Sequence, residues 1–242
     1  SDPSGAEGMQ AKQGRSNLTL MAQHKGIAAI SDLSHLPDAA SKETCKAALA
    51  VLAIKGDTQE QFILEGGLVS LVNLSLEDAD IVGTKCNWAM KRNCAIASYS
   101  ISTNMPLRKR SIRDGAMELL HSVLSEPVVE QDIRELCCRS MELFARDILN
   151  LRSMAKQGAI EALATAVGLD YDKIMQEQGY SQNPKKPGEA TFLFKDPDEK
   201  LCTIALIVIR TICRLSCGVG APCADLVNFG GVAVLQAMTK VY

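Results

Sequence analysis

The chain has 242 residues, 47% of them hydrophobic and 22% charged, so it is too apolar to be intrinsically disordered and long enough to bury a sizeable core. The 26 Lys and Arg residues are balanced by 28 Asp and Glu residues, which excludes the strong basic bias of many nucleic-acid-binding proteins. Only 4% of the residues are aromatic, and the apolar positions are filled by residues that suit closely packed helices. We therefore predict an all-α protein.

Targeting and compartment signals are few. Residues 1–8 lack the basic start and apolar run of a signal peptide and are predicted to be flexible. The most apolar stretch, residues 201–215, contains Arg210 and Arg214 and is too short to cross a bilayer. The nine cysteines are odd in number and scattered through helical patterns. They favour a reducing compartment, and we expect a cytoplasmic protein.

A repeated pattern follows, in which an amphipathic stretch ends at a glycine and an apolar run begins directly after it. Such a junction needs a residue that can adopt a positive φ, because two helices meet there at a sharp angle. The last interval between the marker glycines is longer than the others and predicts an insertion. The five marker glycines are Gly26, Gly67, Gly115, Gly158 and Gly231.

Each glycine is followed by a helix of about three turns, a polar break and a longer helix. A short helix, a glycine, a second helix and a long third helix therefore form one predicted unit. The fifth unit reaches Tyr242 without a third helix. The predicted long helices cover residues 42–55, 84–102, 130–148 and 198–216.

From about Met9 to Tyr242 the sequence resembles the armadillo-repeat family, most closely at residues 61–74 and 156–163. The resemblance implies a right-handed superhelical α-solenoid of about four repeats plus a partial fifth. It also implies a protein-binding scaffold whose third helices line a concave groove. The expected repeats cover residues 9–56, 57–104, 105–149, 150–217 with an insertion at 170–197, and 218–242.

The family members that grip extended peptides carry a Trp and, four residues later, an Asn on each third helix. In this sequence the corresponding positions of the first two long helices are Leu49 and Ala53, then Ile96 and Ser100, and Trp88 lies two turns too early. This departure disfavours capture of nuclear localisation signals.

Arginines are the exceptions on the apolar fourth long helix, which otherwise has the pattern of a helix buried between two repeats. Arg210 and Arg214 share one helix face, and Arg139 lies at a comparable place on the preceding long helix. They predict a basic track for the carboxylates of an acidic or extended partner segment. The alternative is that they pair with acids of the same chain, such as Glu142, or lie at a solvated edge.

A second basic cluster consists of Arg108, Lys109, Arg110 and Arg113. It has the charge to meet phosphate, an anionic membrane or an acidic partner. A solvated outer face is the favoured interpretation, because no aromatic residue is interleaved to stack on bases. We therefore expect no nucleic-acid partner.

The predicted insertion at residues 170–197 has a flexible Pro, Gly and Lys centre, followed by Phe192 and Phe194. A loop of this length is functional or disordered. The two phenylalanines are expected either to pack back on the solenoid or to contact a partner.

Catalytic, cofactor and metal chemistry have no candidate residues at suitable spacing, so we predict a non-enzyme without cofactors. The tightest cysteine group is more typical of buried packing than of a zinc site. The three histidines are His24, His35 and His121, and the cysteine group consists of Cys213, Cys217 and Cys223.

The leading functional hypothesis is a non-catalytic adaptor that recruits a partner polypeptide through the third-helix groove. One version adds a lipidated segment upstream of residue 1, which would hold the protein at the cytosolic face of an organelle, so that the membrane is contacted only indirectly. The alternative is a structural subunit of a larger cytoskeletal or axonemal assembly.

Overall fold

A computed structural model describes residues 17–77, 88–125, 129–177, 199–216 and 230–239. All regular secondary structure in these ranges is helical, which confirms the predicted all-α class. Residues 17–23 are helical. The labelled elements are α2 (Gly26–Leu33), α3 (Ala39–Ile54), α4 (Gln59–Leu64), α5 (Gly67–Glu77), α6 (Trp88–Thr103), η2 (Met105–Leu107), α7 (Arg108–Arg113), α8 (Ala116–Leu124), α9 (Gln131–Phe144), α10 (Leu151–Lys156), α11 (Ala159–Ala166), α12 (Tyr171–Glu177), α13 (Glu199–Ser216) and α15 (Gly231–Met238).

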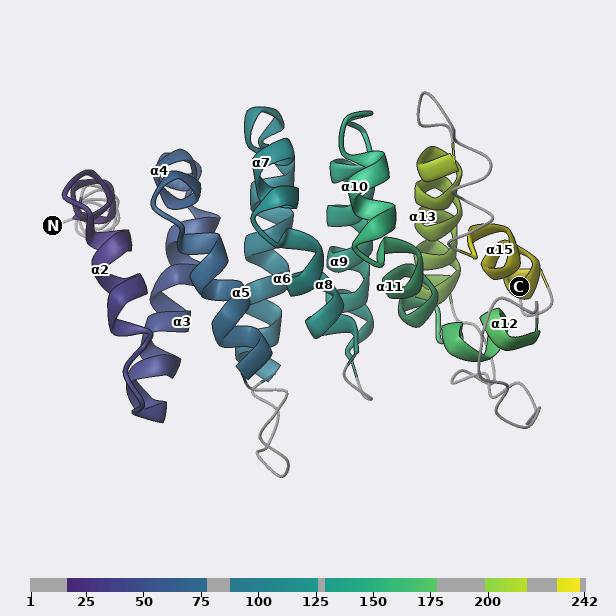
Figure 1. The fold of residues 1–242 in the computed structure, drawn as a ribbon, viewed down its shortest axis with the longest axis horizontal. Coiled ribbons are helices and arrows are strands. Elements are labelled where there is room, and N and C mark those ends of the chain that lie inside the picture. The colour runs from purple at the N-terminus through teal and green to yellow at the C-terminus, as the bar shows by residue number, and fades with distance from the viewer. Residues whose placement is uncertain (1–16, 78–87, 126–128, 178–198, 217–229, 240–242) are drawn as a thin grey trace, which may run out of the picture.

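The helices form successive units that follow one another along the long axis of the molecule (Figure 1). A unit has a short first helix, a second helix and a longer third helix, as in α4, α5 and α6. Third helices contact each other in the order α3, α6, α9 and α13, and second helices do so in the order α2, α5, α8, α11 and α15. One cluster of buried apolar side chains therefore runs through all the units.

A left-handed residue directly precedes or caps the second helix of each described unit. At Gly115 and Gly158 the predicted residue has the positive φ, 98° and 81°. In the other units the prediction is off by one residue, because the left-handed positions are Lys25, Gly66 and Gly230. The marker glycines of those units are instead the first residues of α2, α5 and α15.

Gly67 is still required by its surroundings, although its φ is ordinary. A Cβ atom built there would lie 2.5 Å from Cδ2 of Phe62, a fully buried side chain of α4. The missing side chain lets the two helices of the unit pack ring against backbone. The double glycine thus divides two tasks, the left-handed turn at Gly66 and the close approach at Gly67.

Side chains satisfy the last carbonyl groups of the third helices. The Thr58 hydroxyl donates to the Leu52 carbonyl at 2.6 Å, Nε of Arg108 donates to the Ser102 carbonyl at 2.6 Å, and the Asn150 amide donates to the Phe144 carbonyl at 3.2 Å. Carbonyls at a helix end have no partner within the helix, so these buried donors fix the chain reversal into the next unit.

The third long helix, predicted for residues 130–148, ends at Phe144. The Phe144 carbonyl is the one that the Asn150 amide caps, and Asn150 is itself buried. Residues 145–150 form turns, in which Arg146, Ile148 and Leu149 are exposed. The sequence pattern missed this end because apolar residues, Ile148 and Leu149, continue beyond it.

Buried cations link each unit to the next. Nζ of Lys91 on α6 donates to the Ser122 carbonyl near the end of α8 at 3.2 Å, and Nη1 of Arg134 on α9 donates to the Ala166 carbonyl at the end of α11 at 3.4 Å. Both cations therefore face the negative end of the second helix of the following unit. Lys46 of α3 occupies the same place in the burial pattern and is also buried.

The predicted insertion begins with a helix rather than a loop. Residues of α12 contact α11 and α15, and the Tyr171 and Ile174 side chains pack on the core. The Asp170 carboxylate accepts a hydrogen bond from the Lys173 backbone amide at 3.1 Å, as a helix N-cap residue does. Phe192 and Phe194 lie outside the described residues, so their role stays a prediction.

The left-handed junction can be tested at Gly158, where a Cβ meets no atom closer than 3.6 Å, so that strain in φ is the main cost. We expect Gly158→Val to lower the free energy of unfolding by about 2 kcal/mol. Gly56→Val is the matched control, since a Cβ at Gly56 has no neighbour within 4 Å. Urea denaturation of both variants measures the difference, and equal stability would contradict the junction.

The bridge between units can be tested with Arg134→Met, which keeps most of the apolar stem but removes the donors to the following unit. We expect a loss of about 2 kcal/mol in unfolding free energy, the cost of leaving buried carbonyls without partners. Arg139→Met, on the exposed side of the same helix, is the control and should cost less than about 1 kcal/mol. Thermal unfolding that ranks the variants in the opposite order would refute the bridge.

Candidate functional site on the third helices

The exposed side of the third helices, here called the third-helix face, is the surface to which the sequence assigned partner binding. The burial patterns of α3, α6, α9 and α13 agree when they are superposed. In that superposition Arg139 of α9 corresponds to Val51 of α3, Ile96 of α6 and Leu206 of α13. The face is therefore mixed in chemistry, with apolar and basic side chains at equivalent positions.

The register inferred from the family pattern is wrong on the first long helix. Leu49 and Ala53, which that register assigned to the groove, are fully buried. Ser100 is partly buried, and its hydroxyl donates to the Ile54 carbonyl at 3.0 Å. These residues support the packing of α3 on α6 and are not available to a partner.

Two of the three predicted arginines pair with acids of the chain. Arg139 binds Glu135, one turn earlier on α9, through Nε at 2.8 Å and Nη2 at 2.6 Å. Nη1 of Arg214 lies 3.3 Å from Oε1 of Glu142 on the neighbouring helix α9. The alternative interpretation, pairing with acids such as Glu142, is thus the correct one for Arg214.

Arg210 differs from the other two arginines. Its side chain is exposed, and it makes no hydrogen bond or ion pair with another residue that the structure describes. Leu206 and Ile209 beside it are 55% and 37% exposed. The fourth long helix is therefore not buried all round, as its apolar sequence suggested, but presents an amphipathic strip of Leu206, Ile209 and Arg210.

The predicted basic track is not continuous. Arg139 corresponds to Leu206 and lies one turn before the position of Arg210. Acidic residues also interrupt the face: Asp132 on α9 accepts a hydrogen bond from Lys200 on α13 at 2.9 Å. That bond, helped by the positive charge of Lys200 and Arg92, lowers the pKa of the Asp132 carboxyl, so the pair stays charged into the acidic range.

The second basic cluster is divided by the fold. Arg108, the first residue of α7, is buried against the end of α6 and does not belong to a surface patch. Its burial lowers the pKa of the guanidinium. Arg110 and Arg113 both bind Asp114, each at 3.2 Å. Lys109 is exposed.

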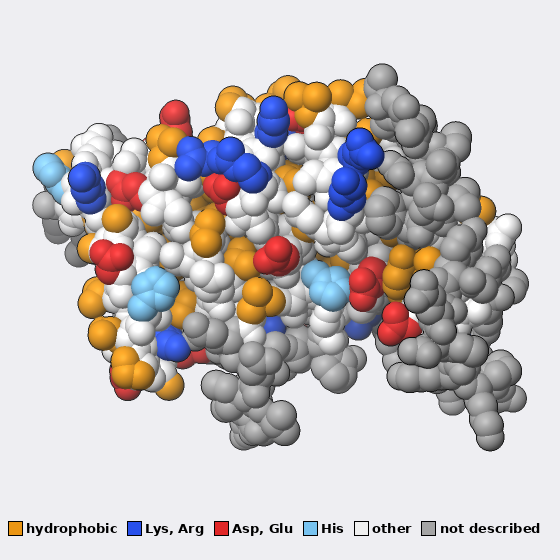
Figure 2. Space-filling model, viewed as in Figure 1, with side chains coloured by type: hydrophobic (Ala, Val, Ile, Leu, Met, Phe, Trp, Pro, Cys, Tyr) orange, Lys and Arg blue, Asp and Glu red, His pale blue; other side chains and the backbone are white. Residues whose placement is uncertain are grey.

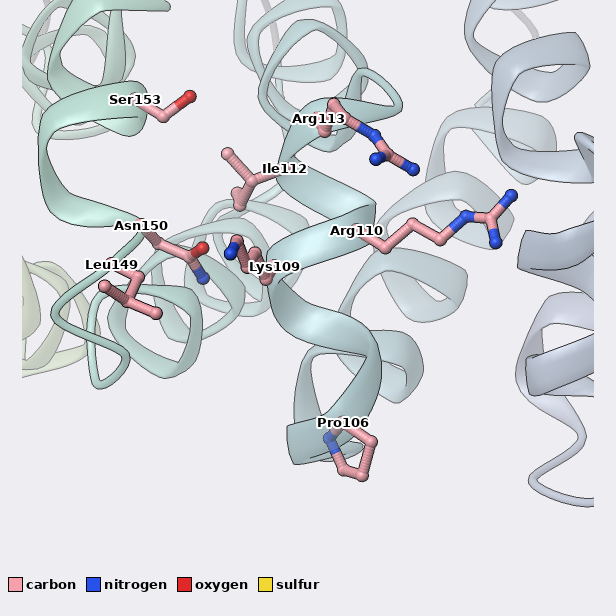
Figure 3. A pocket seen from close by; sticks show the side chains of 8 residues that line it. All are labelled: Pro106, Lys109, Arg110, Ile112, Arg113, Leu149, Asn150 and Ser153. Carbon is pink, nitrogen blue, oxygen red and sulfur yellow. The ribbon is translucent and has the colours of Figure 1, made fainter.

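A pocket of about 520 Å³ lies between α7 and the turn before α10 (Figure 3). Lys109 points from α7 toward the side of Leu149 and Asn150, whereas Arg110 and Arg113 extend to the other side of α7. Its lining combines apolar and basic groups: Pro106, Lys109, Arg110, Ile112, Arg113, Leu149, Asn150 and Ser153.

The described residues offer neither a metal-binding cluster nor a membrane-spanning helix. Within the described ranges, no group of three or more His, Cys, Asp or Glu side chains is placed to hold a metal ion. Cys217 and Cys223 lie outside those ranges, so the predicted absence of a zinc site stays a prediction. None of the described helices has the length and apolar character needed to cross a bilayer.

The buried thiols have the wrong electrostatics for nucleophiles. Cys137 and Cys138 on α9 are fully buried. Burial raises the pKa of Cys137 well above its ordinary value and that of Cys138 to about 12. A thiolate, the reactive form, is therefore scarce at neutral pH.

No protein-family model, curated protein or solved structure matches this chain.

The two classes of thiol predict a clear labelling pattern. At pH 8 iodoacetamide should modify Cys202 and Cys213, which are exposed on α13, and leave Cys137 and Cys138 unmodified until the chain unfolds. The cause is both access and the raised pKa of the buried thiols. Peptide mapping by mass spectrometry before and after addition of denaturant measures it, and early labelling of Cys138 would contradict the packing of α9.

Proposed function

We propose that the chain is an armadillo-type α-solenoid that acts as a protein-binding adaptor. The recurring unit of a short, a second and a long third helix supports the fold, as does the left-handed residue between the first two helices. The consecutive contacts of third helices with third helices support it too. In this arrangement the third-helix face would line the concave side.

The exposed strip on α13 is the observation that carries the binding proposal. Arg210 offers a guanidinium that pairs with no described residue, and the exposed side chains of Leu206 and Ile209 lie beside it on the same helix. A guanidinium binds a carboxylate through paired hydrogen bonds, and adjacent apolar surface gains free energy when covered. The matching partner is an extended segment with an acidic residue next to an aliphatic or aromatic one.

The paired arginines would have a lesser role. A partner carboxylate at Arg139 or Arg214 must compete with Glu135 or Glu142, which already bind them. The Arg139 pair lies at the surface and is worth little net free energy, whereas Glu142 is only 13% exposed and holds Arg214 in a partly buried pair. Binding would therefore depend mainly on Arg210, and the intramolecular pairs would favour partners whose charges match their pattern.

A binding role suits the chemistry of this face better than a catalytic one. Apart from the exposed Arg210, its side chains named here are apolar or paired in ion pairs, while the thiols of α9 are buried and protonated. The described cysteines are free thiols, as expected of the reducing cytoplasm where we place the adaptor. An upstream lipid anchor remains part of this proposal as an indirect route to a membrane.

The adaptor proposal is tested by Arg210→Glu, which reverses the charge at the centre of the strip and leaves the core untouched. Affinity capture from a native lysate, quantified by mass spectrometry, should show at least one partner lost from this variant. Lys156→Glu, an exposed charge reversal on α10, is the control and should retain it. Cross-linking of the wild-type complex then identifies the partner segment that contacts α13, and a synthetic copy of that segment should bind Arg210→Glu at least about ten-fold more weakly than the wild-type chain.

Retention of the same partners by both variants would contradict binding at Arg210. If those partners also formed one stable large assembly, the result would favour the alternative function, a structural subunit held through other faces. Circular dichroism of Arg210→Glu must remain helical for either reading, which the exposure of the side chain leads us to expect.

A further inference from the structure

A second surface carries an inference independent of the adaptor role. The turns that precede the first helices of two neighbouring units expose large apolar side chains: Met105 is 70% exposed, Ile148 50% and Leu149 66%. We call these three residues the apolar edge. At such exposures the side chains stand away from the protein surface, and their hydration is costly unless something covers them.

The apolar edge is one continuous feature. Pro106, next to Met105, and Leu149 line the same pocket, so the two turns lie on either side of it (Figure 3). Helices α7 and α10 that follow these turns are in contact. Figure 2 shows apolar side chains along the margin above α7 and α10.

The local structure holds the tips outward. The Leu149 backbone amide donates to the Asp147 carboxylate at 3.0 Å, while the buried Asn150 side chain caps the end of α9. On the other turn, the buried Arg108 fixes the chain just after η2. Each exposed tip is thus flanked by an anchored residue, and the tips do not need to be ordered by their ligand.

Cations accompany the apolar edge. Lys109 is exposed on the side of α7 that faces Leu149, and Arg146 is exposed two residues before Ile148, whereas Arg113 extends to the other side of α7. Basic side chains gather over α7 and α10 in Figure 2. Arg110 and Arg113 share a single carboxylate, Asp114, and with Asp147 counted as the second acid the cations of this region still outnumber its acids.

We propose that the apolar edge and its cations dock directly on an anionic membrane surface. Separate apolar tips on one margin can enter the interfacial layer of a flat bilayer together, and flanking Lys and Arg side chains are attracted to anionic lipid headgroups. A polypeptide groove would instead place the apolar groups in a recess with the charges at its rim, whereas Met105 and Ile148 lie outside the pocket lining at 70% and 50% exposure. This contact uses residues that are distinct from those of the third-helix face.

Sedimentation with lipid vesicles tests the proposal on the full chain. We expect binding to phosphatidylcholine vesicles that contain about 30% phosphatidylserine and little binding to phosphatidylcholine alone, with a loss of binding at high salt. Met105→Ser combined with Leu149→Ser, and separately Lys109→Glu combined with Arg146→Glu, should each reduce the partition coefficient at least about ten-fold.

Leu33→Ser is the matched control, because Leu33 is 51% exposed on α2 at the far end of the row of helices. It should bind vesicles like the wild-type chain. Failure of the wild-type chain to bind anionic vesicles would overturn the proposal, as would unchanged binding of the Met105→Ser, Leu149→Ser variant. Either result would leave the edge to an acidic protein partner, and neither would affect the adaptor test at Arg210.

Discussion

The left-handed residue between the first and second helices is the constraint on which the rest of the molecule depends. With φ near 80° at Gly66 and Gly158, the chain turns sharply within one residue. The short first helix is thereby set across the second, and the third helix is free to pack on both. Because the same turn recurs, each unit presents the same faces to its neighbours, and one core extends through the row.

Polar groups inside this core specify how units join. Lys91 and Arg134 are buried, yet each donates to carbonyls at the end of the next unit's second helix. Their long apolar stems fill the space between third helices, while their charges meet a helix C-terminus. A one-turn slip between units would leave the cation and the carbonyl buried without partners, so the interaction fixes the stacking register as well as contributing stability.

The two proposed surfaces follow from this architecture. The third helices are held by core contacts on one side, so their other side is free to carry Leu206, Ile209 and Arg210. The turns between units are fixed by buried caps, so their tips can expose Met105 and Leu149 without losing order. An adaptor that binds a polypeptide on one surface and an anionic membrane on another would bring that polypeptide to the membrane.

The sequence by itself determined the helical class and the repeating unit, because apolar periodicity and junction glycines such as Gly115 and Gly158 are local properties of the chain. It did not separate Gly66, which takes the left-handed turn, from Gly67, which lies against Phe62. Only the tertiary structure decided which charges are buried: Arg108 caps a helix and Arg214 meets Glu142 from another unit. Glu142 and Arg214 are 72 residues apart in the chain, and the bond from Arg108 to Ser102 depends on how the chain turns back at the end of α6, so the helical pattern records neither.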